Sequence, residues 1–558
     1  MFRRLLQNVN RRWESMHEAA LLLGVFSLLS QLLGLVRDRL FANLIGPSST
    51  LDVYYAAFRI PDFLYISVAS LASITVLMPF LVDRINAEGK EKAKIFLGEV
   101  LAGFLLLLVA VALIVFIFMP FIATKIAPGF SEEQLKLLVG TSRIMLLSPI
   151  FMGFSNMLGT ITQLLRKFFI FSLSPIFYNV GIILGIVLFY PKFGVYGLGI
   201  GVALGAILHL LVQIPTIVAG GFTPKFLPRL QFKTLIEVAK LSLPRTLGLS
   251  MNSLLVLVLI AIGSTLTVGS ISIFSLSYNL QTVPIMIIGV SFAVASFPIL
   301  SETFSKGDMT KWTDCILSSI RQIIFWSLPL STLLIVLRAQ IVRVVLGSGV
   351  FTWEHTKLVA AALALFSISV FAQNMILVIV RGFYSAHNSK TPLLINTFCS
   401  LFSIALAFIF VYLFKSVPTF RYFMESLLRI DDMSGGVVIM LPFAYSIGVI
   451  LNAWLHWRHL RANYLTASHG LRRAFIESIA ASFGIGLVSY FLLNIFTNYV
   501  TISTTLGVFL QGLFAGIGGI FAGIIILYFM GNEQFLDLVN VLRQKFWKVK
   551  LKVVDGQE

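Results

Sequence analysis

The chain has 558 residues, of which 58% are hydrophobic and 12% are charged. Soluble globular proteins are typically about 25% charged, so this composition excludes an ordinary soluble enzyme and a disordered chain. Apolar segments of about 20 residues recur along the sequence, as in a polytopic helical membrane protein, whereas a β-barrel would show alternating strands of about 10 residues. The net charge of +18 is spread over short loops between these segments. Anionic lipid headgroups are therefore the expected partner of the basic residues, and nucleic acid is not.

The sequence predicts an all-α membrane protein with fourteen spans. In chain order they are 19–46, 52–83, 95–126, 132–165, 168–190, 194–219, 235–265, 268–303, 310–342, 353–385, 390–414, 435–460, 472–496 and 504–531. The basic start has no apolar core and no small-residue cleavage site, so it is not expected to be a removable signal peptide. With the N-terminus inside, the inner segments hold about three times as many Lys and Arg residues as the outer loops, which predicts that both termini are cytoplasmic.

An internal repeat divides the predicted spans. Pro175-x3-Asn179 recurs as Pro392-x3-Asn396 at an offset of 217, and Ile45-Gly46 and Met78–Leu81 have counterparts at nearly the same offset. Because each repeat holds six spans, the two copies must be parallel, with a pseudo-twofold axis along the membrane normal. The predicted organisation is a basic cytoplasmic segment 1–18, a lobe 19–220, a linker 221–234, a second lobe 235–460, two extra spans within 472–531 and a basic cytoplasmic tail 532–558.

Charged residues cluster in the first two spans. A charge inside the bilayer is energetically costly, so these residues are candidates for a functional site. Polar residues follow helical spacing at Ser30, Gly34, Arg37 and Asp38 in span 1 and at Asp52, Tyr55, Arg59 and Asp62 in span 2. Two interpretations stay open. Arg37–Asp38 and Arg59–Asp62 could be ion pairs that only neutralise one another, or the arginines could line a solvated cavity that admits an anionic headgroup, because guanidinium groups bind phosphate oxygens bidentately.

Other intramembrane polar residues give weaker signals. Arg245, near the start of span 7, could meet the first cluster or could extend to the cytoplasmic interface, as is also expected of Arg143 and Arg321. Span 8 carries a polar, uncharged stripe that includes Asn279. His209 is expected to be a hydrogen-bonded core histidine rather than a proton relay.

Motifs of catalysis and metal binding are lacking in the sequence. There is no P-loop, nucleophile elbow or HExxH motif, and the two cysteines, Cys315 and Cys399, have no metal-ligand spacing. We therefore expect neither an enzyme nor a cofactor or metal site, and any transport must be driven by a gradient, by the membrane potential or by mass action.

The stretch LLGLVRDRLFANLIGPSSTLDVYYAAFRIPDFL (32–64) resembles the opening of the MurJ (MviN) family of lipid II flippases, which belong to the MOP superfamily with the MATE exporters. The segments APGF (127–130), PILSETFSKGD (298–308) and RGFYSAHNSKTP (381–392) extend the similarity over essentially the whole chain. The resemblance implies that Arg37, Asp38 and Asp52 match residues of the family's first two spans and that Arg59 replaces a basic residue there. Departures are also present: the family usually has arginines at the positions of Gln31, Tyr65 and Asn279, and an asparagine is common at Asp62. The family's sodium ligands have no counterparts, since Leu259 and Ala405 fall near those places, so no sodium site is predicted.

The resemblance implies a flippase that moves an undecaprenyl-diphosphate-linked peptidoglycan precursor from the inner to the outer leaflet of the bacterial inner membrane by alternating access. On this hypothesis Arg37, Arg59 and Arg245 bind the diphosphate, while Asp38, Asp52, Asp62 and Asn279 position the arginines. A monomer is expected, with the cell-wall synthesis machinery as a further candidate partner. The alternatives are a flippase for another polyprenyl-linked glycan such as an O-antigen unit, a MATE-type antiporter, and a membrane scaffold without transport.

Overall fold

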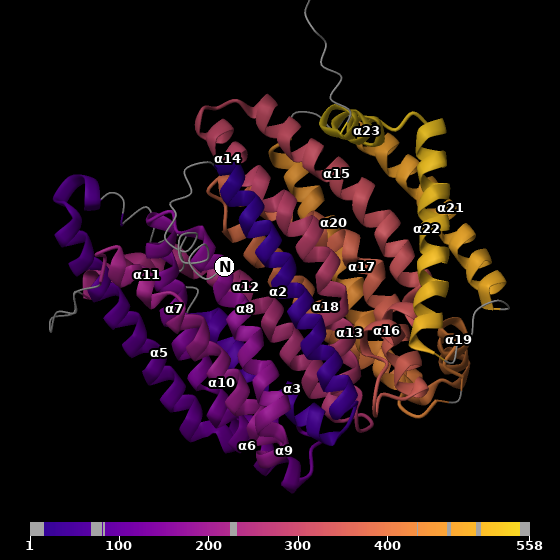
Figure 1. The fold of residues 1–558 in the computed structure, drawn as a ribbon, viewed down its shortest axis with the longest axis horizontal. Helices are drawn as coiled ribbons and strands as arrows, with labels where there is room; N and C mark the ends of the chain where they lie inside the picture. Colours follow the sequence, from indigo (N-terminus) through magenta and orange to yellow (C-terminus); the bar gives the residue numbers. More distant parts are fainter. Residues whose placement is uncertain are drawn as a thin grey trace, which may run out of the picture. The chain divides into compact units, whose positions relative to one another are not determined.

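The computed structural model describes residues 16–68, 81, 84–223, 232–431, 433–465, 470–497 and 504–546 (Figure 1). In these residues the regular structure is helical and no strand occurs, which confirms the predicted all-α membrane fold. Twelve of the described helices are long and apolar enough to cross a membrane. The first two predicted spans are also helical, but the second continues past Val68 into residues outside the described part.

The helices follow the predicted spans closely. Those of the first six spans are α2 (Met16–Leu44), α3 (Ser49–Val68), α5 (Lys90–Ile126), α6 (Glu132–Met145), α7 (Leu147–Leu164), α8 (Phe168–Leu184), a π-helical turn η2 (Gly185–Phe189), α9 (Tyr190–Phe193), α10 (Val195–Leu211) and α11 (Ile214–Ala219). Those that follow are α12 (Phe232–Ser264), α13 (Ser270–Pro284), a second π-helical turn η3 (Ile285–Val290), α14 (Ser291–Ser305), α15 (Met309–Val336), α16 (Arg338–Leu346), α17 (Trp353–Ser385), α18 (Lys390–Ser416), α19 (Pro418–Leu428), a 3₁₀ turn η4 (Gly436–Ile439), α20 (Met440–Asn463), α21 (Leu471–Thr497), α22 (Thr505–Phe529) and α23 (Glu533–Phe546).

Three features differ from the predicted elements. The predicted span 310–342 is interrupted at Leu337, so that α15 ends there and the separate helix α16 follows. The loop after span 11 contains α19, which begins at Pro418 because a proline is tolerated in the first helical turn. The predicted basic tail contains α23, which packs against α15 and α22.

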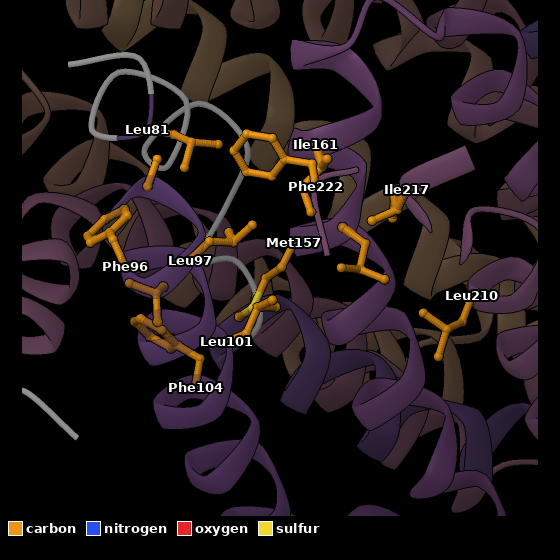
Figure 2. Close-up of a cluster of buried hydrophobic side chains, with 13 residues drawn as sticks. Leu81, Phe96, Leu97, Leu101, Phe104, Met157, Ile161, Leu210, Ile217 and Phe222 are labelled. Carbon is orange, nitrogen blue, oxygen red and sulfur yellow. The ribbon is translucent and has the colours of Figure 1, made fainter. Parts of the chain in front are cut away.

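The chain forms two compact units. Unit 1 comprises residues 1–283, 345–362 and 388–452, and unit 2 comprises 284–344, 363–387 and 453–558. In unit 1, α5 packs against α7 through a cluster of buried aliphatic and aromatic side chains that extends to α10 and α11, with Phe96, Leu97, Met157 and Ile161 at its centre (Figure 2). In unit 2, α21 packs against both α22 and α15. The lobes predicted from the repeat stay a prediction.

Glycines bring α10 of unit 1 into direct backbone contact with α8 and with the start of η2. A Cβ at Gly201 would lie 2.5 Å from the Cα of Gly185, and a Cβ at Gly181 would lie 2.2 Å from the Cα of Gly205. Small residues at such spacing let membrane helices approach closely, so that packing rather than a hydrophobic driving force stabilises the pair. This seam holds α8 in place, and α8 carries part of the candidate site.

The seam predicts that Gly201→Ala destabilises the protein although alanine is the better helix former. Overpacking a tight contact costs about 1–3 kcal/mol, so the detergent-solubilised variant should unfold several degrees below the wild type in a thermal-shift measurement. Gly24→Ala is the matched control, because no atom lies within 4 Å of its new Cβ. Equal melting temperatures for the two variants would show that the seam is not tightly packed.

Candidate functional site

The candidate site centres on Arg37 and Asp38, near the end of α2 in unit 1. The Nε and Nη2 atoms of Arg37 donate to Asp38 Oδ1 at 3.0 and 2.9 Å. The Arg37 side chain is 21% exposed, whereas that of Asp38 is 3% exposed. The acid is therefore buried, whereas the arginine side chain is partly exposed.

Helices far apart in the sequence complete this pair. Arg37 Nη1 donates to Asn179 Oδ1 on α8 at 3.2 Å, and Asn279 Nδ2 on α13 donates to Asp38 Oδ2 at 3.1 Å. Asn179 in turn donates to Ser30 Oγ at 3.3 Å. Asn279 is thus brought to the predicted cluster, and both carboxylate oxygens of Asp38 are used. This network fixes the plane of the Arg37 guanidinium group. Asn179 lies on α8, and Asp38 is itself held by Asn279 on α13.

Arg59 and Asp62 lie at the same site but form no comparable pair. Both side chains are half-buried, and Arg59 Nε is buried without a hydrogen-bond partner in the described part of the chain. Asp62 lies within electrostatic range of Arg59, yet no hydrogen bond or ion pair joins these two described residues. Tyr54 and Tyr55 lie within electrostatic range of both Arg37 and Arg59, so the two arginines belong to the same region of unit 1. The neutralising ion pair that the sequence left open therefore exists at Arg37–Asp38 and not at Arg59–Asp62.

Asp52, which the sequence groups with the positioning residues, has other partners. Its carboxylate accepts hydrogen bonds from the backbone N–H of Gly269 at 2.7 Å, from the N–H of Ser272 at 2.7 Å and from Ser272 Oγ at 2.6 Å. These groups form the N-terminus of α13, whose unpaired amides and positive dipole favour a carboxylate. Asp52 is therefore a helix cap that joins α3 to α13, and not a neighbour of the arginines.

Further contacts close this end of unit 1, where α2 and α12 end and α3 and α13 begin. Gly129 N donates to Ser264 Oγ at 3.2 Å, and Val350 N donates to Asn43 O at 3.1 Å. Gly349 has a positive φ of 56°, and a Cβ there would lie 1.9 Å from Asn43 Oδ1. Connections from both predicted lobes therefore interlock around Asp52; we refer to residues 43–52, 127–131, 264–272 and 345–350 as the closed end.

The remaining predicted residues are placed as follows. The Arg245 side chain lies outside the described residues, although its helix packs on α3, where Ser250 Oγ and Ser67 Oγ are 3.1 Å apart. Arg143 donates to Phe116 O at 3.1 Å instead of reaching the site.

Tyr65 and His209, which the sequence analysis singled out, each form a hydrogen bond with a neighbouring helix. Tyr65, at a position where the resembling family usually has arginine, bonds to Asn156. His209 is buried and 2.7 Å from Ser155 Oγ, which confirms the hydrogen-bonded core histidine.

Sequence reasoning did not assign Asn179 to the site. Its signal was present, because Asn179 belongs to the repeated Pro-x3-Asn pattern, and an amide in an apolar span needs hydrogen-bond partners. Its Nδ2 also donates to the backbone carbonyl of Pro175, one helical turn earlier, at 3.2 Å. The pattern alone does not show that the amide oxygen of Asn179 accepts a hydrogen bond from Arg37. Among the described residues, no three His, Cys, Asp or Glu side chains gather as a metal site would require.

The fold is that of the MOP superfamily of transporters. A solved structure titled "Lipid II flippase MurJ, inward closed conformation" matches with a TM-score of 0.71 at 21% identity, over 93% of this chain and 100% of that one. A MATE family multidrug transporter in an inward-facing conformation matches with a TM-score of 0.62 at 16% identity, over 78% of this chain and 95% of that one.

Sequence comparisons define the family. The model of the family "Lipid II flippase MurJ" matches residues 41–510. Proteins named "Probable lipid II flippase MurJ" from Buchnera aphidicola (subspecies Schizaphis graminum) and Thermotoga maritima are each 29% identical, over 67% and 69% of this chain and 73% and 77% of theirs. The chain belongs to the MurJ lipid II flippase family, and it is a multi-pass protein of the inner membrane.

Proposed function

We propose that this protein moves lipid II from the cytoplasmic to the outer leaflet, with the diphosphate held by Arg37 and Arg59. The observation that carries the proposal is the half-buried pair of guanidinium groups inside a helical bundle, one held rigidly by Asp38 and Asn179 and the other with a buried Nε that lacks a partner. Planar guanidinium groups bind phosphate oxygens bidentately and are less strongly hydrated than ammonium groups. A diphosphate supplies the acceptors that Arg59 lacks.

The closed end suggests the state in which the substrate enters. If both termini are cytoplasmic, as the charge asymmetry predicts, α2 runs outward and the closed end faces the outside. The substrate then reaches the arginines from the cytoplasmic side. In the proposed cycle the two predicted six-helix lobes rock, so that the contacts of the closed end separate and the site opens outward. An inside-negative potential favours outward movement of each negative charge by about 2.3 kcal/mol per 100 mV.

The positioning residues divide into two roles in this proposal. Asp38 and Asn279 hold Arg37 while the site is empty, and Asp62 competes electrostatically for Arg59. Asp52 acts at the closed end. Arg245 is kept as a candidate ligand from α12. We further propose that the chain works as a monomer that delivers its product to the cell-wall synthesis machinery.

A depletion–rescue experiment tests the proposed function. We expect the gene to restore the accessibility of lipid II at the outer leaflet, and growth, in bacteria depleted of their own lipid II flippase. Protein in the membrane should be quantified by immunoblot. A correctly inserted and folded protein that fails to restore lipid II accessibility would contradict the substrate assignment and would favour another polyprenyl-linked glycan or a non-transporting role.

A further inference from the structure

The C-terminal helix α23 is fixed to unit 2 by a buried polar link. Asn532 caps the helix, because its Oδ1 accepts from Phe535 N at 2.9 Å. Its Nδ2 donates to Glu477 Oε2 on α21 at 2.7 Å, and Arg473 Nε donates to Glu477 Oε1 at 2.6 Å. Asn532 is fully buried and Glu477 nearly so. The start of α23 therefore has a defined position on α21.

The position of α23 relative to the membrane surface follows from the residues before it. The span α22 ends at Phe529, and Tyr528 and Phe529 are 63% and 82% exposed. Large aromatic residues at the end of a span mark the interface between lipid tails and water. Only three residues separate Phe529 from Glu533, the first residue of α23. In Figure 1, α23 turns away from the end of α22 rather than continuing it, and it contacts α22 and α15. It therefore begins in the interface.

The helix has three distinct sides. Gln534, Phe535 and Leu538 face the protein, where Phe535 packs with Phe325, Ala481 and Leu527. At about 100° per residue, Leu536, Val539 and Arg543 lie within about 60° of one another on a second side. Leu536 and Val539 are each 40% exposed.

The third side is acidic and the sequence that follows is basic. Glu533 and Asp537 are exposed and lie about 40° apart on the helical wheel, on the other side of Leu536 from Val539 and Arg543. The basic residues Arg543, Lys545, Lys548, Lys550 and Lys552 occur without an acidic residue between them. Basic residues next to an exposed apolar side are typical of a helix that lies in the plane of a membrane.

We propose that the Leu536–Val539–Arg543 side of α23 is a binding surface for anionic phospholipids. Leu536 and Val539 enter the region between headgroups and acyl chains, and Arg543 contacts lipid phosphates, while Glu533 and Asp537 face water. Charge complementarity and continuity with α22 favour a lipid leaflet over a protein partner. This surface is independent of the arginines of unit 1 and of the substrate that they bind.

Site-directed spin labelling in nanodiscs tests the position of the helix. Single cysteines are placed at Leu536, Val539 and Asp537 of the full chain, in a background with Cys315→Ser and Cys399→Ser. Labels at Leu536 and Val539 should be relaxed mainly by oxygen, which concentrates in lipid, and the label at Asp537 mainly by a water-soluble nickel complex. Equal accessibility to nickel at all three positions would overturn the proposal. Protection of the Leu536 and Val539 labels from both reagents would also overturn it, since it would indicate a second copy or a protein partner.

Binding of a defined lipid tests the basic residues. The probe is phosphatidylglycerol, measured by native mass spectrometry, with phosphatidylcholine for comparison. The triple variant Arg543→Gln, Lys545→Gln, Lys548→Gln should bind phosphatidylglycerol at least about tenfold more weakly, because each basic residue near an anionic surface contributes a factor of about five. The matched control removes three exposed lysines elsewhere, Lys92→Gln, Lys306→Gln and Lys311→Gln. An equal loss in both variants would show a general charge effect and would overturn the assignment to α23.

Discussion

Replacement of Arg37 by alanine is expected to abolish rescue of flippase-depleted cells, with transport reduced by more than about 100-fold. The variant loses the bidentate donor to the diphosphate and leaves Asp38 buried without its cation, which costs about 3–5 kcal/mol. Arg37→Lys should keep part of the activity, because a point charge replaces the guanidinium fork incompletely. Colony formation and outer-leaflet lipid II accessibility are the readouts.

A second variant separates ligand binding from stability. In Arg37→Ala/Asp38→Asn the orphaned carboxylate is neutralised, so we expect thermal stability to recover most of the loss while transport stays abolished. Recovery of transport together with stability would mean that Arg37 only holds the fold. Arg143→Ala is the matched control, since this arginine binds Phe116 O and stacks on the Phe116 ring; it should keep nearly full activity.

Replacement of Asp52 by alanine is expected to open the closed end. The carboxylate binds two backbone amides and a hydroxyl of α13, and these bonds must break whenever that end separates. Loss of such a cap is worth about 2 kcal/mol, or about thirtyfold in the ratio of closed to open protein. Because the cap stabilises one state of the cycle only, transport should fall although the arginines are intact. Asp52→Asn should give an intermediate shift, as it keeps one acceptor oxygen.

Double electron–electron resonance between spin labels at Glu133 and Val268, both near the closed end, measures this shift. The wild type should show mainly a short distance, and Asp52→Ala a larger population at a longer one. Asp308→Ala is the control, because Asp308 also caps a helix, accepting from Lys311 N at 3.1 Å, but lies outside the closed end. An unchanged distance distribution in Asp52→Ala would mean that the cap does not bias the conformational equilibrium.

The fold could be predicted from the sequence almost span by span, because a lipid environment requires long apolar helices and the limits of α17, α18 and α21 follow directly from hydropathy and flanking charge. The break at Leu337 was not predicted, although Arg338, Gln340 and Arg343 interrupt the apolar sequence directly after it. Helix α23 was hidden within a basic tail. Its apolar side repeats at helical spacing, but net charge dominated the interpretation.

The candidate site could be predicted in part. Arg37 and Asp38 stood out because unpaired charges are energetically costly in a membrane, and Asn279, which the sequence groups with them, donates a hydrogen bond to Asp38. Asp52 was grouped with the arginines because it lies on the same helix at a regular spacing, yet its partners are backbone amides 217 and 220 residues away. Every residue except proline has a backbone N–H group, so the sequence does not indicate which of these groups Asp52 binds. Only the fold could show that Asp52 caps α13.

Competition for lipid II binding tests most directly whether the guanidinium groups of α2 and α3 bind a diphosphate. Fluorescent lipid II is bound to the purified wild type and displaced with undecaprenyl diphosphate or undecaprenyl monophosphate. We expect the diphosphate to compete at least about tenfold better, and this preference to disappear in Arg37→Ala/Asp38→Asn. Equal competition by both lipids in the wild type, or an undiminished preference in the variant, would contradict recognition of the diphosphate by Arg37.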